Sequence, residues 1–337
     1  MTLNVGVIGT GMIGQDHIRR LTHVLSGVRV AAVTDVDLDR ARSVADSDDS
    51  GGVTVHESGR ALIEDPGVEA VVVTSWGPTH EEYVLACLAA GKQVFCEKPL
   101  ATTREACDRI IDAEVALGRR LVSVGFMRRY DAQYRAMKAV VTGGEIGAPL
   151  MMHAAHRNPS VPDHFTSDMI IVDSTVHDID VARFMFDEEV TAVTVLKPRV
   201  SSKAKAGFND PLFVLLEMES GVLVDVEASV NAGFAYDIRG EVVCEDGTVE
   251  LSESAGAVVK RAGAYSGRVA ADWRERFVLA FDAEFQAWID AVAAGGTTGP
   301  SAWDGYAATV VCDTGLAALR SGAREPVSLR EKPDLYK

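Results

Sequence analysis

The sequence lacks the cysteine pattern of a disulfide-rich or zinc-binding protein. Its five cysteines are odd in number and scattered over 337 residues, and no two of them have the C-x-x-C spacing. Neither a disulfide framework nor a cysteine zinc site is therefore indicated. The pattern fits a reducing compartment, and we expect a cytoplasmic protein.

Long hydrophobic runs and a basic N-terminal leader are also missing. No apolar stretch approaches the roughly 20 residues that cross a bilayer. The start of the chain, MTLNVGVIGTG, reaches glycines without a basic segment followed by an apolar one. We therefore expect neither a membrane span nor a signal peptide.

The sequence has fewer basic than acidic residues. The chain has 33 Lys and Arg against 49 Asp and Glu, a formal net charge of -16. Such a surface repels nucleic-acid phosphates and anionic membranes, so neither is expected as a partner. A neutral small molecule remains open, as does an anion held by local basic residues. The length and the 47% hydrophobic content allow two domains and a sizeable core.

The first third of the chain carries a dinucleotide-binding pattern. Residues 4–8 predict a buried strand, a turn with the G-x-G-x-x-G spacing follows, and residues 15–25 predict a helix. Such a turn places backbone N–H groups and a helix N-terminus against a pyrophosphate. The cofactor-binding residues expected in this turn are Gly9, Gly11, Met12, Ile13 and Gly14.

An acidic residue follows at the end of the next predicted strand, residues 29–37. Asp35 stands where a carboxylate accepts hydrogen bonds from the adenosine ribose hydroxyls. Its charge would repel the additional phosphate of NADP, so NAD is the expected cofactor.

Strand and helix patterns alternate up to residue 126, which predicts a doubly wound parallel sheet. We therefore expect an α/β protein whose residues 1–126 form an NAD-binding Rossmann domain. Ligands lie beyond the carboxyl ends of the strands in such sheets, which places TSWGPTH and CEKP beside the cofactor. The residues expected there are Ser75, Trp76, His80, Glu97 and Lys98.

Residues 127–337 change character. The stretches 211–231 and 237–251 read as hairpins with SG and DG turns, and helices are expected at about 273–294 and 304–321. These features predict an α+β domain with a large, mostly antiparallel sheet. Helices on one face of that sheet would leave the other face to a subunit interface. We assign residues 127–337 to substrate binding and oligomerisation.

The stretch DSTVHDID places Asp173, His177 and Asp180 on one face of a helix, because their spacings are four and three. In one interpretation Asp173 is merely the N-cap of that helix. In the other, His177 is a general base and Asp173 fixes its tautomer, as a carboxylate does in a catalytic triad. Lys98, if charged beside the substrate oxygen, would stabilise a developing alkoxide.

Several motifs together resemble the glucose-fructose oxidoreductase and inositol dehydrogenase (Gfo/Idh/MocA) family. They are GVIGTGMIG, CEKPLATT, GFMRRYD, HAAHRNP, DSTVHDIDVARF, YDIRGEVVCEDG and PSAWDGYAA, and the resemblance extends nearly from end to end. E-K-P is shared across that family, whereas GFMRRYD, HRNP and AYDIRGEVVCEDG are more particular to its inositol branch. The resemblance implies NAD-dependent oxidation of myo-inositol at its 2-hydroxyl to the 2-keto product, in inositol catabolism, by a homotetramer.

The resemblance also implies roles for individual residues. Lys98, Asp173 and His177 would be catalytic, with His177 as the acid/base. Asp178 stands where members of the inositol branch often have glutamate. Because Asp178 points off the Asp173 face, we expect the chemistry to remain intact. The substrate contacts implied are Lys98, Arg128, His156, Asn158, Asp173, His177 and Tyr236.

Other interpretations remain open at this point. The chain could oxidise another polyol or sugar, such as scyllo-inositol, D-chiro-inositol or glucose. It could also be a glycosidase that uses NAD transiently, or a dinucleotide-binding sensor, although a sensor does not require a base and its orienting carboxylate. No metal is expected, because His153 and His156 are three residues apart on a predicted strand and face opposite sides.

Overall fold

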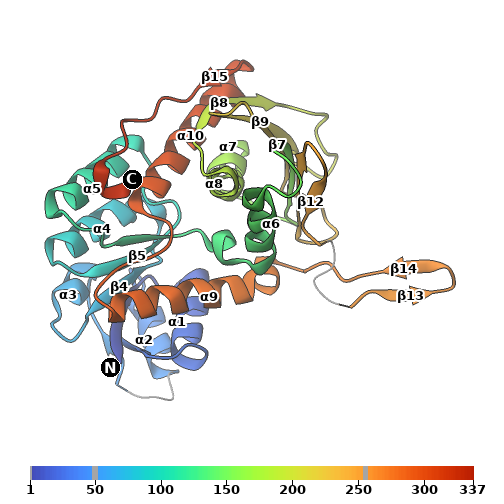
Figure 1. The fold of residues 1–337 in the computed structure, drawn as a ribbon. Helices are drawn as coiled ribbons and strands as arrows, with labels where there is room; N and C mark the ends of the chain where they lie inside the picture. The colour runs from blue at the N-terminus through green and yellow to red at the C-terminus, as the bar shows by residue number, and fades with distance from the viewer. Residues whose placement is uncertain (1, 48–51, 253–256) are drawn as a thin grey trace. The chain divides into compact units, whose positions relative to one another are not determined.

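The computed structural model describes residues 2–47, 52–252 and 257–337, and the chain divides into two compact units (Figure 1). The first unit comprises Met1–Phe126, Phe281–Thr309 and Arg330–Lys337, and the second comprises Met127–Ala280 and Val310–Leu329. Two segments that the sequence analysis placed in the second domain thus cluster with the first. Unit boundaries fall inside two helices, α9 (Trp273–Ala293) and α10 (Ala302–Ser321).

The first unit contains a six-stranded sheet in the order β3-β2-β1-β4-β5-β6. All neighbouring strands are parallel, so the predicted doubly wound parallel sheet is confirmed. The strand order reverses between β1 and β4, and ligands bind at the carboxyl ends of the strands beside such a reversal. The strands are β1 (Leu3–Ile8), β2 (Val28–Thr34), β3 (Thr54–Val55), β4 (Ala70–Val73), β5 (Gln93–Glu97) and β6 (Val122–Gly125).

Helices cover this sheet, and one of them comes from late in the chain. A parallel sheet needs cover on both faces because its strands are apolar on both sides. The part of α9 in the first unit packs on β5, where the rings of Phe95 and Phe285 lie 4.2 Å apart, and Trp288 is 1% exposed. The other helices of this unit are α1 (Met12–His23), α2 (Leu38–Asp46), α3 (Gly59–Glu64), α4 (His80–Ala89) and α5 (Arg104–Leu117).

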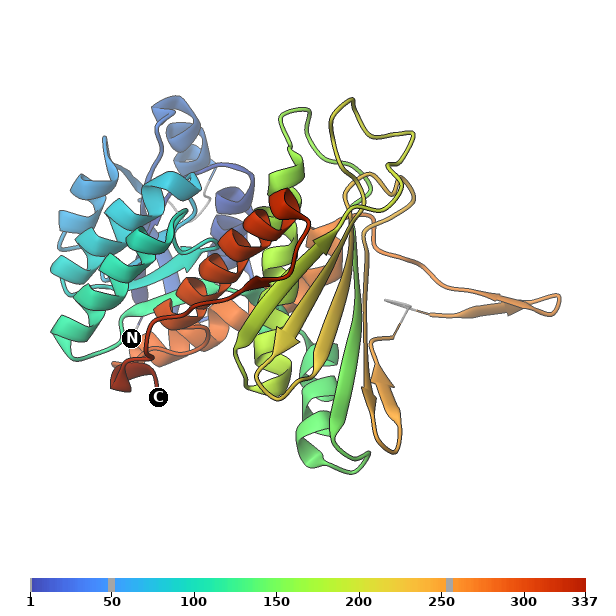
Figure 2. The same ribbon diagram turned by 90° about the horizontal axis from the view of Figure 1, so that it is seen from above.

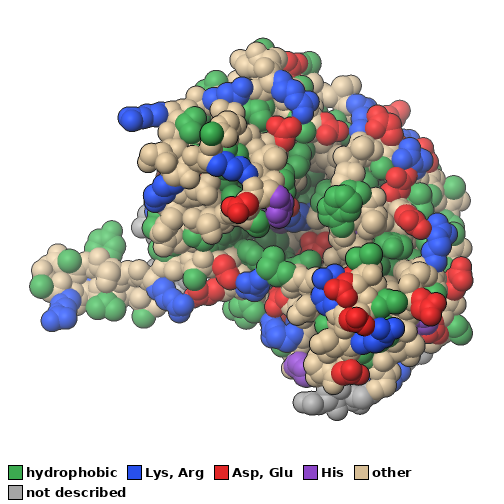
Figure 3. Space-filling model, turned by 180° about the vertical axis from the view of Figure 1, so that it is seen from behind, with side chains coloured by type: hydrophobic (Ala, Val, Ile, Leu, Met, Phe, Trp, Pro, Cys, Tyr) green, Lys and Arg blue, Asp and Glu red, His purple; other side chains and the backbone are tan. Residues whose placement is uncertain are grey.

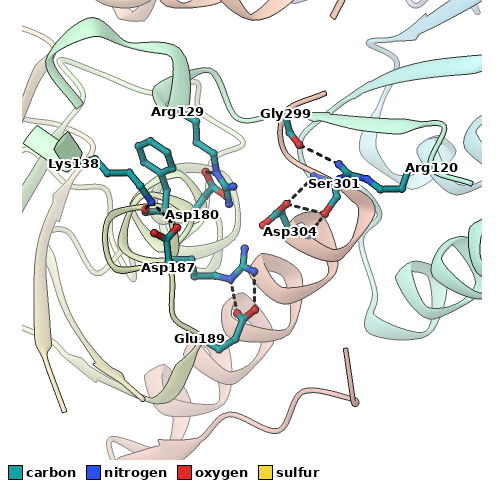
Figure 4. Close-up of polar contacts among 11 residues, drawn as sticks. Arg120, Arg129, Lys138, Asp180, Asp187, Glu189, Gly299, Ser301 and Asp304 are labelled. Carbon is teal, nitrogen blue, oxygen red and sulfur yellow. Dashed lines mark hydrogen bonds and ion pairs between the residues drawn. The ribbon is translucent and has the colours of Figure 1, made fainter. Parts of the chain in front are cut away.

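The segment between α9 and α10 lies along β6. The Val124 N–H donates to the Pro300 carbonyl over 2.8 Å. Figure 4 shows Arg120, just before this strand, donating to the carbonyl of Gly299 over 3.2 Å. These contacts bind a segment from the last fifth of the sequence to the edge of the first sheet.

The end of the chain is anchored on α5 by a buried carboxylate. Glu114 accepts hydrogen bonds from the Tyr336 hydroxyl at 2.5 Å and from the Leu121 and Val122 N–H groups at 2.5 and 2.7 Å. Burial raises the pKa of Glu114 although all three donors act in the opposite direction. The last residues of the sequence are thereby part of the first unit.

The second unit is built on a seven-stranded sheet in the order β12-β11-β7-β10-β9-β8-β15. All neighbours are antiparallel except β7 and β10, so the predicted, mostly antiparallel sheet is confirmed and its one parallel pair is an addition. The strands are β7 (Pro149–Arg157), β8 (Val190–Leu196), β9 (Leu212–Met218), β10 (Leu223–Ser229), β11 (Asp237–Cys244), β12 (Thr248–Glu250) and β15 (Glu325–Pro326).

Helices lie on one face of this second sheet, as Figure 2 shows. Among the described residues, no helix combines the length and the apolar character that crossing a bilayer requires. The helical elements are η2 (Met127–Tyr130), α6 (Ala132–Gly143), α7 (Ser167–Met169), the π-helical η3 (Ile170–Thr175) and α8 (Val176–Phe186).

The other face of the second sheet, called here the open face, carries partly exposed apolar side chains. Burial alternates along β9 and β10, as expected for a sheet with one covered face. Met151 and Leu223, paired across β7 and β10, are 39% and 42% exposed. His153 lies on this face and contacts Asp225 at 2.5 Å.

A two-stranded hairpin of β13 (Val259–Arg261) and β14 (Ala264–Ser266) projects from the second unit (Figures 1 and 2). All six strand residues are exposed. An isolated two-stranded hairpin is marginally stable in water at best. Figure 3 shows hydrophobic and basic side chains along it.

We expect Tyr336→Phe to destabilise the first unit. The change removes a hydrogen bond to a buried carboxylate, which contributes roughly 1.5 to 3 kcal/mol to the free energy of unfolding. Urea unfolding followed by circular dichroism measures the difference. Tyr265→Phe is the matched control, because the Tyr265 side chain is exposed on β14. Equal midpoints for the two variants would contradict the anchoring role.

Candidate active site

Packing within the protein requires a glycine at two of the three glycine positions of the G-x-G-x-x-G turn. Gly9 has a φ of +100°, and a Cβ there would lie 2.6 Å from the backbone nitrogen of Ser75. A Cβ on Gly14 would lie 2.0 Å from the Gly9 carbonyl oxygen, so α1 packs closely on the turn. Around the Cβ position of Gly11, no atom of the described residues lies within 4 Å, apart from Gly11 itself and its neighbours along the chain. The protein's own packing does not require a glycine there, whereas a pyrophosphate approaching the backbone does.

The N-terminus of α1 is open to an anion. Its N-cap is Gly11, so no side chain of the described residues caps the first turn, and that turn has no acidic residue. Its backbone N–H groups and the helix dipole both favour negative charge. Met12 and Ile13 form this turn, and Met12 is exposed. The turn therefore fits the phosphates of a dinucleotide.

Asp35 is held rigidly just past the end of β2. Its Oδ2 accepts from the N–H of Thr10 at 2.6 Å, and its Oδ1 accepts from the N–H of Asp37 at 2.9 Å and from Arg40 at 2.5 Å. Partial burial alone would raise the pKa of Asp35, but these hydrogen bonds hold that pKa below its usual range. The carboxylate is therefore charged at neutral pH. Arg40 stays 40% exposed beside it.

His80 connects the ends of β4 and β5. Its ring is buried, with Nε2 2.9 Å from the Ser75 carbonyl oxygen and Nδ1 2.7 Å from that of Pro99. Burial lowers the pKa of His80, although both carbonyl acceptors act in the opposite direction. His80 thus supports the backbone on either side of the predicted cofactor site. Trp76 is 78% exposed, and Lys98 is partly buried directly before Pro99.

Glu97 and His17 form a buried contact beneath the turn. Nε2 of His17 lies 2.7 Å from Glu97 Oε1, and Arg20 contacts Nδ1 of the same ring. Because arginine only donates, Nδ1 accepts, and the proton lies on Nε2 and is donated to Glu97. Burial lowers the pKa of His17, which agrees with a neutral ring. This contact joins α1 to the end of β5, one residue before Lys98.

Asp173 and His177 lie in one continuous helical segment of the second unit. The segment begins at Ser167, and its cap is Thr166, whose side chain accepts from the Met169 N–H. Asp173 lies inside the π-helical η3, and His177 in the first turn of α8. The N-cap interpretation of Asp173 is therefore wrong, because the helix starts two turns earlier. Single π-helical turns occur frequently at functional sites.

Asp178 is a central residue of the second unit, although the sequence analysis gave it no role. Its Oδ1 accepts from Arg128 at 2.6 Å, and its Oδ2 lies 2.8 Å from Nδ1 of His156. All three side chains are at least 97% buried. Burial alone would raise the pKa of Asp178, but Arg128 and His156 keep that pKa below its ordinary value. Asp178 therefore carries a charge that cancels that of Arg128.

Four of the predicted substrate residues lie close together around this ion pair. The ring centroids of His156 and His177 are 6.4 Å apart, and those of His156 and Tyr236 are 5.9 Å apart. Arg128 lies over the ring of Phe277, with 5.5 Å to its centroid. Its Nε is buried without a hydrogen-bond partner among the described residues, so it offers a donor.

Asn158 and Asp180 have different surroundings. Asn158 follows β7, and its N–H donates to the Ser229 carbonyl over 2.8 Å, so the backbone of this predicted substrate residue is fixed at the end of β10. Asp180 lies on α8, two residues beyond Asp178. Figure 4 shows Arg129 and Asp180 pointing toward one another, and both of their hydrogen bonds are short, 2.9 and 2.7 Å. This pair ties η2 to α8.

The structure thus gathers the predicted residues in two groups. The first unit holds Gly9, Gly11, Gly14, Asp35, Ser75, Trp76, His80, Glu97 and Lys98, and the second holds Arg128, His156, Asn158, Asp173, His177 and Tyr236. His153 and His156 do face opposite sides of β7, as predicted. No group of metal-binding side chains occurs within the described part of the chain.

Sequence reasoning missed His17, Phe277 and the role of Asp178. A signal for His17 was present, because it lies three residues before Arg20 on a helix whose buried face would otherwise be apolar. Asp178 gave no such signal, since its partners come from η2 and β7. Only the folded chain brings these three elements together.

The chain is similar to curated proteins over its whole length. It is 54% identical to inositol 2-dehydrogenase 3 of Saccharopolyspora erythraea, covering 100% of this chain and 98% of that protein. It is 52% identical to inositol 2-dehydrogenase of Pseudomonas fluorescens, covering 100% of both. Among solved structures, it matches myo-inositol dehydrogenase from Lactobacillus casei in complex with NAD(H) and myo-inositol, with a TM-score of 0.96, 36% identity and full coverage of both chains.

Two family models match the chain in order. Residues 3–126 match the model described as the oxidoreductase family with an NAD-binding Rossmann fold. Residues 134–250 match the GFO/IDH/MocA C-terminal domain. With these two matches and the full-length relatives, the chain belongs to the GFO/IDH/MocA family of oxidoreductases.

Proposed function

We propose that the chain is an NAD-dependent inositol 2-dehydrogenase, which oxidises the 2-hydroxyl of myo-inositol to give 2-keto-myo-inositol (scyllo-inosose) in inositol catabolism. The observation that carries the proposal is the 54% identity, over the whole chain, to a protein named inositol 2-dehydrogenase 3. The two groups of predicted site residues would supply the parts that this reaction needs: a cradle for a dinucleotide, a base, and polar partners for a neutral polyol.

The first unit would hold the cofactor through the glycine turn and Asp35. When bound, NAD supplies the acceptor for the hydride that leaves the alcohol carbon. His177 takes the hydroxyl proton, and Asp173, four residues earlier, orients its ring and stabilises the imidazolium. Lys98 supplies positive charge where the alkoxide develops.

The polar cluster of the second unit suits an uncharged substrate. The charges of Arg128 and Asp178 cancel, so the cluster does not demand an anionic ligand. A polyol presents hydroxyl groups that both donate and accept, and each buried polar group left unpaired costs about 1 to 3 kcal/mol. The N–H groups of Arg128, the imidazole of His156 and the hydroxyl of Tyr236 would satisfy several hydroxyls at once.

We expect His177→Ala to lower inositol oxidation by about 10²- to 10⁴-fold in kcat, because removal of a general base has that effect. The KM for NAD should stay near that of the wild type, because the dinucleotide residues lie in the other unit. NADH absorbance measures both quantities. His23→Ala is the control, since His23 is exposed at the end of α1. A fully active His177→Ala enzyme would remove this residue from the mechanism.

Asp173→Asn should lower kcat with little change in melting temperature. An amide keeps the shape of the side chain but does not stabilise an imidazolium. Adding His177→Ala to Asp173→Asn should cost little more than His177→Ala alone, because residues that act as one unit are non-additive. A fully additive loss would show that the two residues act independently.

Cofactor preference should depend on Asp35 and Arg40 together. Asp35→Ser removes the charge that repels the 2′-phosphate of NADP and releases Arg40 from its ion pair. We expect the preference for NAD in kcat/KM to narrow by about tenfold or more. The double variant Asp35→Ser/Arg40→Ala should lose most of the gain with NADP. A wild-type enzyme that prefers NADP would overturn the assignment of Asp35.

We further propose a cytoplasmic homotetramer assembled through the open face. Met151 and Leu223 there, and Val259 and Tyr265 on the projecting hairpin, are apolar and exposed in the single chain. Burying them against further copies would remove apolar surface from water. The five cysteines are buried, which suits a reducing compartment.

Sedimentation velocity at micromolar concentration should give a tetramer for the wild type. Leu223→Lys should shift the distribution toward smaller species, because it places a charge in the proposed interface. Val115→Lys, an equally exposed apolar position on α5, should leave the distribution unchanged. A wild-type protein that is monomeric and active would contradict the proposed tetramer.

A further inference from the structure

Nδ1 of His156 lies within hydrogen-bonding distance of two neighbouring side chains. Nδ1 lies 2.8 Å from Asp178 Oδ2 and 3.1 Å from a guanidinium nitrogen of Arg128. Arginine only donates and an ionised carboxylate only accepts, so the two neighbours demand opposite protonation states of Nδ1. The partners around this nitrogen therefore decide the tautomer.

The hydrogen bond to the Asp178 carboxylate is the stronger of the two and determines the tautomer. If Nδ1 were unprotonated, its lone pair would face the negative Oδ2 at 2.8 Å, with both atoms buried and no water between them. If Nδ1 carries the proton, it makes a charge-assisted hydrogen bond to Asp178, at the expense of the longer contact with Arg128. Arg128 keeps its own 2.6 Å hydrogen bond to Asp178 Oδ1.

His17 shows the opposite arrangement in the same chain. There the arginine contacts Nδ1 and the carboxylate contacts Nε2, so the two demands fall on different nitrogens. Both are met at once, with the proton on Nε2. At His156 both demands fall on Nδ1, and Asp178 decides between them.

We infer that Asp178 is a positioning residue that fixes His156 as the Nδ1–H tautomer, so that Nε2 meets the substrate as a hydrogen-bond acceptor. The inference rests on the proposed function for the identity of the substrate. His156 then recognises one hydroxyl of the substrate, the one that donates to Nε2. A site built to pair with a hydroxyl discriminates strongly against an analogue that lacks it.

The isosteric change Asp178→Asn should reverse this tautomer. Arg128 only donates, so the amide oxygen of the new side chain turns toward Arg128 and its NH₂ group toward His156. Nδ1 of His156 then accepts, and the proton moves to Nε2. The histidine would stay in place while its Nε2 changes from acceptor to donor.

The test compares wild-type enzyme and Asp178→Asn over a panel of monodeoxy-inositols that each keep the reacting 2-hydroxyl. For the wild-type enzyme we expect the kcat/KM of one analogue, the one that lacks the hydroxyl bound by His156, to be lower than that of myo-inositol by about tenfold or more. In Asp178→Asn the difference in kcat/KM between this analogue and myo-inositol should largely disappear. The KM for inositol should rise, and the KM for NAD should stay unchanged. In a His156→Gln background, Asp178→Asn should alter the panel little. Asp225→Asn is the matched control, because it removes an Asp–His contact on the opposite face of β7.

A second measurement reads the tautomer without any substrate. In protein labelled with ¹⁵N-histidine, the His156 signals, identified by their loss in His156→Gln, should report Nδ1–H in wild type and Nε2–H in Asp178→Asn. Unchanged nitrogen signals would overturn the inference, as would a uniform loss over the whole panel that leaves its pattern intact. Wild-type protein inactive on every inositol would contradict the proposed function instead, and the nitrogen spectrum would still decide the role of Asp178.

Discussion

A buried carboxylate that touches a buried imidazole determines which ring nitrogen carries the proton, and both units of this chain contain such a contact. In the first unit, Glu97 and Arg20 hold opposite nitrogens of His17 and keep its ring neutral. In the second, Asp178 and Arg128 meet at one nitrogen of His156. Removing either carboxylate would leave a buried arginine or imidazole without its acceptor. In each unit, the protonation of a buried histidine therefore depends on one of these two acids.

The two groups of predicted site residues differ in net charge, in agreement with the ligands proposed for them. Asp35 keeps its charge, and its hydrogen-bond partners hold the carboxylate in one orientation, as the proposed contact with ribose hydroxyls requires. The Arg128–Asp178 pair presents no net charge to the substrate. A buried ion pair is weak evidence for stability, because desolvation offsets much of its attraction. Its geometric effect is clearer, because Asp178 contacts His156, whose ring lies beside those of His177 and Tyr236.

Much of the fold was predictable because its signals are local. The glycine turn, the acid after β2, the two hairpins and the late helices are each encoded in a short stretch of sequence. The errors came from contacts between distant segments. Asp178 was set aside because a helical wheel shows only its own helix, and Asp173 was offered as a cap because the π-helical turn leaves no pattern in the sequence. The one parallel strand pair likewise depends on the whole sheet.

Helix α9 has a consequence for how the protein is made. The ribosome releases the six strands of the first sheet early, yet Phe285, Trp288 and Ile289, which cover one face of it, emerge more than 150 residues after β6. During that interval an apolar face of the sheet has no native cover. Tyr336, which completes the hydrogen bonds of Glu114, emerges about 50 residues later still. Synthesis of the first unit thus starts before that of the second and is completed after it, and a chain cut at residue 126 would expose the surface that α9 buries.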